Sequence, residues 1–395
     1  MANGIIIMHW DDRIGAEITT AYPEGIDKKI QIKTLMQLYA QHEYTGEAGF
    51  VFLTIGDLNL VSYYTGPNTK YYIVLSLDED EEGAEFQEGI LILTRQLMEI
   101  VSDPDLVKDR IPYLFKQAAA YPYFTEEQKL GIFFADEIKR KILERFRMEM
   151  MVSRSDIELW IKQNFEIYVD IEALLEQLMS MGLVKTVSVK GISSDMMFFV
   201  QDIMMLRHPP IEILKDPTAH NMPAPLKKFY VEEVQNFFKQ YILNESDNMK
   251  IIANVICDVD TYNVFKLLRE NVYTMSELKE KTNKNEVELG HILKSLWELK
   301  MITVLEDAHK VEFYCILSDF YIGKFYPTYN IDTILKSHAN KVQSKKVLLK
   351  ALDIMREEYY IQHAGGKKIK KGKIEKAAEA KVKSKVLAET PVKSM

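Results

Sequence analysis

Cysteine is almost absent from this chain of 395 residues. Its two cysteines, Cys257 and Cys315, are far apart, and neither belongs to a CxxC pair. A disulfide framework and a zinc site built on cysteine pairs are therefore excluded. So little cysteine is typical of a reducing compartment, and we expect a cytoplasmic protein.

Long apolar segments are also missing. The run Gly4–Met8 is apolar but short, and Asp11, Asp12 and Arg13 follow it closely, which is unlike a signal peptide. No stretch approaches the roughly 18 uncharged apolar residues of a transmembrane helix. We therefore expect no membrane span.

Sequence motifs of catalysis and cofactor binding are absent as well. The chain contains no GxxxxGK[ST], HExxH or GxSxG pattern, and the segment 66–70 has phosphate-loop letters at the wrong spacing. Its eight histidines are scattered. We expect no enzymatic activity, no cofactor and no metal site.

Charge is distributed unevenly along the chain. The net charge is −8, but residues 365–395 hold ten lysines and three glutamates, so the tail is +7 and the remainder −15. An acidic body disfavours nucleic-acid binding by the folded part. The tail has too few large apolar residues to pack a core, so we expect disorder there.

The first 102 residues predict a strand–strand–helix–strand–strand–strand–helix order. The expected strands are Gly4–Trp10, Ala16–Tyr22, Gly49–Ile55, Leu58–Thr65 and Tyr71–Leu77. The first helix should begin near Asp27 with an apolar stripe of Ile32, Leu35, Met36 and Tyr39; the stripe of the second is Phe86, Ile90, Leu93, Leu97 and Ile100. We expect Gly49–Ile55 to be buried on both faces and to turn at Gly56-Asp57 into the next strand.

This order predicts an antiparallel sheet with segregated helices, an α+β fold. It resembles the longin domain of the profilin-like group, over about residues 4–120 if Asp105–Tyr121 is a third helix. The resemblance rests on element order. A PAS-like or roadblock-like sheet is the alternative, although roadblock domains usually begin with a helix and this chain begins with a strand.

The remainder twice shows three helices followed by a hairpin, the order of a winged helix. The first set has helices at 126–148, 153–165 and 170–182, with Ser153 as a cap and Gly182 at the C-terminal end, and a hairpin at 184–201. The second has helices at 261–270, 274–283 and 286–302, then a hairpin at 303–318. A proline-rich linker at 208–225 and a helix at 226–242 separate the two sets.

The predicted domains follow from this pattern. A long C-terminal helix is expected at Asp332–His363, with Leu348, Leu352, Met355 and Tyr359 as its buried stripe. The expected divisions are 1–122 for the longin-like domain, 123–207 for the first winged helix, 208–245 for the linker and connecting helix, 246–328 for the second winged helix, 329–364 for the C-terminal helix and 365–395 for the tail.

Two charged segments are candidate contact sites. Asp11, Asp12 and Arg13 occupy a tight turn that is either an ordinary polar hairpin or a protruding tip that meets a partner. An arginine on such a tip is able to reach a GTPase active site, as arginine fingers do. The acidic run 78–82 lacks the spacing of an EF-hand loop, so we interpret it as a solvated loop.

The expected recognition helices bear on DNA binding. The helix within 168–182 has three acidic and no basic residues, while 284–302 balances three lysines against three glutamates. Neither resembles a DNA-reading helix. The candidate contacts with nucleic acid or an anionic membrane are Lys294, Lys300, Lys367, Lys368, Lys370, Lys371 and Lys373.

These features favour a protein-binding adaptor or regulator. The order of a longin domain followed by winged helices is similar to that of the nitrogen-permease-regulator-like regulators of small GTPases. That resemblance implies a small GTPase or a membrane-trafficking complex as partner, and no residue role carries over because no motif matches position by position. The alternative is a transcriptional regulator whose second winged helix binds DNA.

Overall fold

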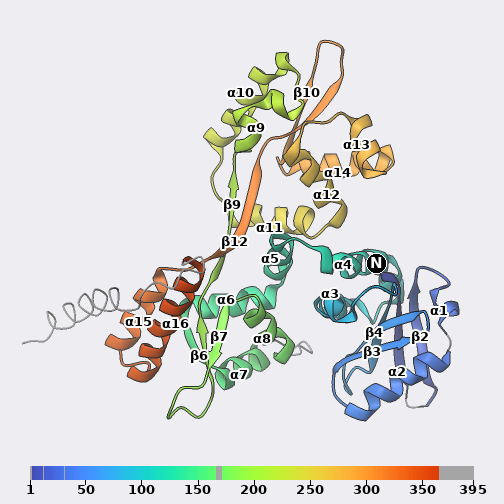
Figure 1. Ribbon diagram of the computed structural model, residues 1–395, viewed down its shortest axis with the longest axis vertical. Helices are drawn as coiled ribbons and strands as arrows, with labels where there is room; N and C mark the ends of the chain where they lie inside the picture. The colour runs from blue at the N-terminus through green and yellow to red at the C-terminus, as the bar shows by residue number, and fades with distance from the viewer. Residues whose placement is uncertain (1, 12, 31, 166–170, 364–395) are drawn as a thin grey trace, which may run out of the picture. The chain divides into compact units, whose positions relative to one another are not determined.

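The computed structural model describes residues 2–11, 13–30, 32–165 and 171–363 (Figure 1). They fold into two compact units of mixed helix and strand. Of the described residues, the first unit holds those up to Glu144, with Ile161–Gln177 and Ile203–Phe325, and the second holds Arg145–Trp160, Leu178–Asp202 and those from Tyr326 to His363. No helix in the described part of the chain is long and apolar enough to cross a membrane. The domain boundaries expected from the sequence stay predictions.

The N-terminal part of the first unit is a five-stranded antiparallel sheet, as expected (Figure 1). Its strand order is β2-β1-β5-β4-β3. The strands are β1 (Ala2–Asp11), β2 (Gly15–Tyr22), β3 (Gly49–Ile55), β4 (Leu58–Tyr64) and β5 (Tyr71–Leu77). Ile55 pairs with Leu58, so the expected two-residue turn at Gly56-Asp57 is confirmed. The order leaves β2 and β3 at the two edges.

Helices cover both faces of this sheet because successive strand residues point to opposite sides. On one face α3 (Gln87–Ile100) and α4 (Pro104–Ala120) pack on Ile5, Ile7, Val61, Ile73 and Leu75. On the other, α1 (Ile26–Lys29) and α2 (Ile32–Thr45) pack on Ile6, Met8, Leu60 and Val74. The expected stripe of α3 is buried at Phe86, Ile90, Leu93 and Leu97. On α2, Leu35 and Leu38 are buried but Met36 is 39% exposed, a correction to the predicted stripe.

Two segments with a similar element order follow, and the first has one additional short strand, β6 (Met151–Ser153). The first has α6 (Glu137–Glu149), β6, α7 (Arg154–Asn164), α8 (Ile171–Ser180), β7 (Val184–Val187), β8 (Met196–Phe199) and β9 (Asp202–His208). The second has α12 (Val259–Glu270), α13 (Met275–Thr282), α14 (Glu286–Glu298), β10 (Ile302–Glu306), β11 (Glu312–Ile316) and β12 (Asp319–Phe325). Strands β9 and β12, which we did not expect, pair with each other.

The two segments also repeat their local interactions. Ser153 and Thr274 cap the second helices, and Gly182 and Lys300 both adopt positive φ after the third helices. In each, an arginine of the first helix binds the aspartate that begins the last strand: Arg147 to Asp202 at 2.9 Å and Arg269 to Asp319 at 2.8 Å. We interpret the two segments as an internal structural repeat.

Three further expectations need correction. The helix expected at 126–148 is broken into α5 (Glu126–Ala135) and α6, because Asp136 leaves helical geometry and its side chain accepts from the backbone N of Lys139 at 3.1 Å. The expected C-terminal helix is α15 (Tyr329–Ala339) plus α16 (Lys345–His363), whose buried residues are Val347, Leu348, Ala351 and Ile354. Leu352 and Tyr359, expected to be buried, are exposed.

The linker also holds more structure than its prolines suggested. Residues 208–226 include α9 (Ile211–Lys215) and two short 3-10 helices, Pro217–His220 and Ala224–Leu226. Helix α10 (Lys227–Gln240) follows, and then α11 (Glu245–Ile251), which we did not expect.

Candidate protein-interaction surfaces

The edge strand β3 departs most from the sequence expectation. It was predicted to be buried on both faces, but it lies at the sheet edge and pairs with β4. Phe52 and Ile55 are 47% and 40% exposed. Seven residues, GFVFLTI, run along this edge without a charge or a proline. Charged residues and proline usually protect natural edge strands, because the outer N–H and C=O groups of an edge strand are a template for pairing with another strand.

Side chains of β3 extend the cores without being enclosed by them. Phe50 packs on Tyr63 with ring centroids 4.7 Å apart and lies parallel to Phe52 at 6.3 Å. Val51 and Leu53 border the opposite core under α2. The strand therefore offers both an exposed backbone edge and an apolar margin on each face.

The predicted contact at the first turn is only partly described, since Asp12 lies outside the described residues. Asp11 accepts from the backbone N–H groups of Arg13 at 2.7 Å and Ile14 at 3.0 Å. These two bonds hold the pKa of the Asp11 carboxyl below its ordinary value. Asp11 thus stabilises its own turn, while Arg13 is exposed and Ile14 is 78% exposed.

The acidic run 78–82 forms a loop beside the sheet. Asn59 on β4 donates through Nδ2 to the carbonyl oxygens of Asp78 at 3.0 Å and Glu81 at 2.7 Å. These bonds give the loop a structural anchor. Within the described residues, no group of three or more His, Cys, Asp or Glu side chains could hold a metal ion.

Two of the lysines predicted to contact nucleic acid, Lys294 and Lys300, lie in the described part of the chain. Lys294 lies exposed on α14 with its Nζ 3.9 Å from Glu298. Lys300 lies after the helix, and its Nζ is 4.6 Å from the ring centroid of Trp297. Glu286 and Glu288 are exposed on the same helix. The five tail lysines, 367, 368, 370, 371 and 373, lie outside the described residues.

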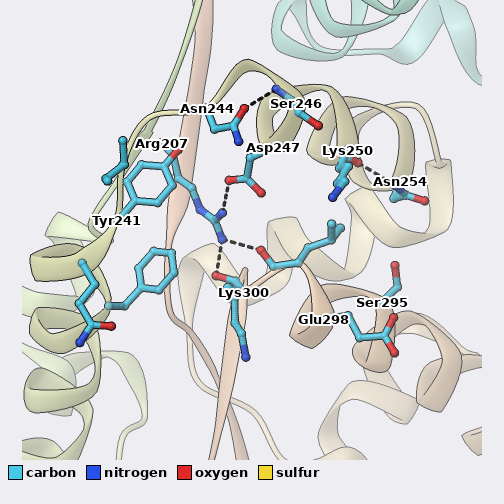
Figure 2. A pocket seen from close by; sticks show the side chains of 14 residues that line it. Arg207, Tyr241, Asn244, Ser246, Asp247, Lys250, Asn254, Ser295, Glu298 and Lys300 are labelled. Carbon is cyan, nitrogen blue, oxygen red and sulfur yellow. Dashed lines mark hydrogen bonds and ion pairs between the residues drawn. The ribbon is translucent and has the colours of Figure 1, made fainter.

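Arg207 of β9 forms the wall of a cleft of about 660 Å³ (Figure 2). Its side chain, 2% exposed, donates to Ser318 Oγ at 2.9 Å, Asp247 Oδ2 at 2.6 Å and the carbonyl oxygens of Leu299 and Lys300 at 2.5 and 2.6 Å. It also stacks on Phe237. Because these acceptors engage the guanidinium, Arg207 joins β9, α11 and the end of α14, which is a structural role.

Polar side chains line the open part of this cleft. They are Gln240, Asn244, Ser246, Asp247, Lys250, Asn254, Ser295 and Glu298. Lys250 and Asp247 reach into it from α11 (Figure 2). Basic side chains (Arg207, Lys250 and Lys300) and acidic ones (Asp247 and Glu298) both line this cleft.

Burial lowers the pKa of one histidine and of one lysine far below their ordinary values. His42 of α2 lies 3.0 Å from Ser62 Oγ, and burial lowers its pKa to about 4. Lys139 of α6 is 3.5 Å from Asp136, which also pairs with Arg95, and burial and then the charge of Arg95 lower the pKa of Lys139 to about 7. Both side chains are nearly inaccessible, so neither is placed to act on a substrate.

No family model and no curated protein matches the chain. Sequence reasoning missed the exposure of Phe52 and Ile55 and the role of Arg207. The signal for β3 was present, because a seven-residue uncharged strand bounded by a two-residue turn fits an edge as well as a sheet centre.

Proposed function

We propose that this chain is a non-enzymatic adaptor or regulator that binds another protein through the edge strand β3. The supporting observation is the unprotected edge itself, with its exposed Phe52 and Ile55. A partner strand that pairs with β3 would satisfy its outer backbone groups and cover both side chains. The antiparallel sheet enclosed by helices on both faces also fits the proposed longin-like domain.

The opposite edge gives an internal comparison. Strand β2 includes Glu17 and exposes mostly small or polar side chains, with Ile18 37% exposed. A charged side chain on an edge disfavours pairing with another strand. The proposal therefore assigns the partner to β3.

A small GTPase is the partner class we propose, on the basis of the longin and winged-helix order. The two repeated segments fit winged-helix modules that support the assembly. The acidic residues on α14 do not support the alternative, a transcriptional regulator that reads DNA. Arg13 is exposed on the β1–β2 turn. Measuring both GTPase binding and GTP hydrolysis with an Arg13→Ala variant separates a role of this arginine in binding from a role in hydrolysis.

The test compares two lysine substitutions at exposed edge positions. Thr54→Lys places a charge on β3, and Ala16→Lys places one on β2. Affinity purification of the full chain from its native lysate, with quantitative mass spectrometry, should recover a partner with the wild type and with Ala16→Lys but not with Thr54→Lys. Equal recovery with both variants, or no saturable partner, would contradict the proposal.

A further inference from the structure

One exposed face of α14 carries two large apolar side chains and a glycine. This α14 face consists of Glu286, Val287, Gly290, Lys294 and Trp297, which share one side of the helix at 3.6 residues per turn. Val287 is 70% exposed and Trp297 is 49% exposed. The buried side of α14 carries Leu289, Leu293 and Leu296 instead.

Gly290 lies in the middle of this face, although the packing of the described residues does not require a glycine there. A glycine in a helix interior costs about 1 kcal/mol relative to alanine. A Cβ at Gly290 would meet nothing within 4 Å among the described residues, so their packing does not require a glycine. It leaves a notch between Val287 and Lys294 where another helix backbone could approach closely.

The charges on this face are self-complementary about the notch. Glu286 and Lys294 lie four residues before and after Gly290, about 6 Å along the axis in each direction. If two α14 helices cross antiparallel at Gly290, each Glu286 meets Lys294 of the second copy. Within the chain Glu286 pairs with Lys279 at 3.3 Å and Lys294 with Glu298 at 3.9 Å; these exposed pairs are weak and can exchange.

We infer that the α14 faces of two copies pack against each other around a two-fold axis at Gly290, giving a homodimer. Such an isologous contact forms two symmetry-related Glu286–Lys294 pairs. One helix face buries less than the roughly 800 Å² per partner of a standard interface. The dimer is therefore weak, and its population depends on protein concentration.

The test is a charge swap on the full chain, read by sedimentation over a series of protein concentrations. Glu286→Lys and Lys294→Glu should each weaken dimerisation roughly tenfold, since two attractive pairs become repulsive. The double variant restores both pairs and should recover the wild-type dissociation constant. Glu144→Lys, exposed on α6, is the control for the change in net charge and should have no effect.

Gly290→Ala provides a second readout that misfolding cannot imitate. It should raise the thermal stability of the chain, because alanine favours the helix, and still weaken the dimer by filling the notch. A monomer at every concentration, or a dimer indifferent to both single charge reversals, would overturn the inference. The dimer does not depend on the proposed β3 contact, so Thr54→Lys should leave it intact; its loss in that variant would place the second copy on the sheet edge.

Discussion

Replacing Lys139 with methionine should stabilise the protein near neutral pH. Lys139 is 5% exposed, and it shares the carboxylate of Asp136 with Arg95, so two cations compete for one buried anion. Its Nζ also lies over the ring of Phe133, 5.1 Å from the centroid. Methionine would keep most of the packing, remove one cation and leave Asp136 paired with Arg95.

The magnitude follows from the pKa of Lys139. That pKa falls from its ordinary 10.5 to about 7 in the folded protein, so between these values the unfolded chain binds one more proton than the folded chain. The free energy of unfolding of the wild type should therefore rise with pH from about 7 upward, by about 1.4 kcal/mol per pH unit. Below pH 7 both states are protonated, and the buried charge costs several kcal/mol.

Urea unfolding followed by circular dichroism at several pH values between 6 and 10 tests this reasoning. Lys139→Met should be more stable than the wild type by several kcal/mol at pH 6–7, and the difference should shrink as pH rises. Lys141→Met is the matched control, because Lys141 is exposed on the same helix and pairs with Glu137. A Lys139→Met variant that is less stable at pH 7, with a difference independent of pH, would refute the argument.

Three further predictions concern other parts of the chain. The pKa of His42 is lowered from 6.5 to about 4, so the free energy of unfolding should fall by about 1.4 kcal/mol per pH unit as pH drops from 6.5 toward 4. Unfolding of His42→Gln, which retains a partner for Ser62, should lack this pH-dependent loss. Arg269→Met should lower the unfolding free energy by about 3 kcal/mol or more in thermal or urea melts, with Arg269→Lys intermediate, because it leaves the carboxylates of Asp319 and Glu127 without their guanidinium. Deletion of residues 365–395 should shift the melting temperature by only about a degree or two, as their composition predicts no core contact; a large drop in calorimetry would contradict that.

Local signals in the sequence were sufficient for most individual elements. The apolar residues Phe86, Ile90, Leu93 and Leu97 predicted α3, because spacings of three and four residues place them on one side of a helix. The caps at Ser153 and Thr274 and the positive φ of Gly182 likewise depend on neighbouring residues alone. For that reason both repeated segments could be recognised in outline.

Features that depend on distant residues could not be predicted. Strands β9 and β12 form because residues more than 100 positions apart pair, and neither has a strong strand pattern by itself. The break at Asp136 depends on its capping bond to the backbone N of Lys139, which competes with helix continuation. The edge position of β3 depends on the strand order, which the apolar run does not specify.

The candidate surfaces were predictable to a smaller extent. Arg13 and Lys294 are both exposed, as residues that contact a partner must be, but the contacts proposed for them from the sequence stay predictions. Gly290 was visible as a glycine inside a helical pattern. Its significance required the structure, which shows that a Cβ there would meet nothing.

Hydrogen–deuterium exchange of the complex with the recovered partner tests the central claim most directly. The outer backbone N–H groups of β3, between Gly49 and Ile55, should exchange fast in the free protein, because the strand order leaves them without a ladder partner. Binding should protect them strongly and leave the amides of β2 unchanged. Protection confined to β2 or α14, with β3 amides exchanging as in the free protein, would contradict the account.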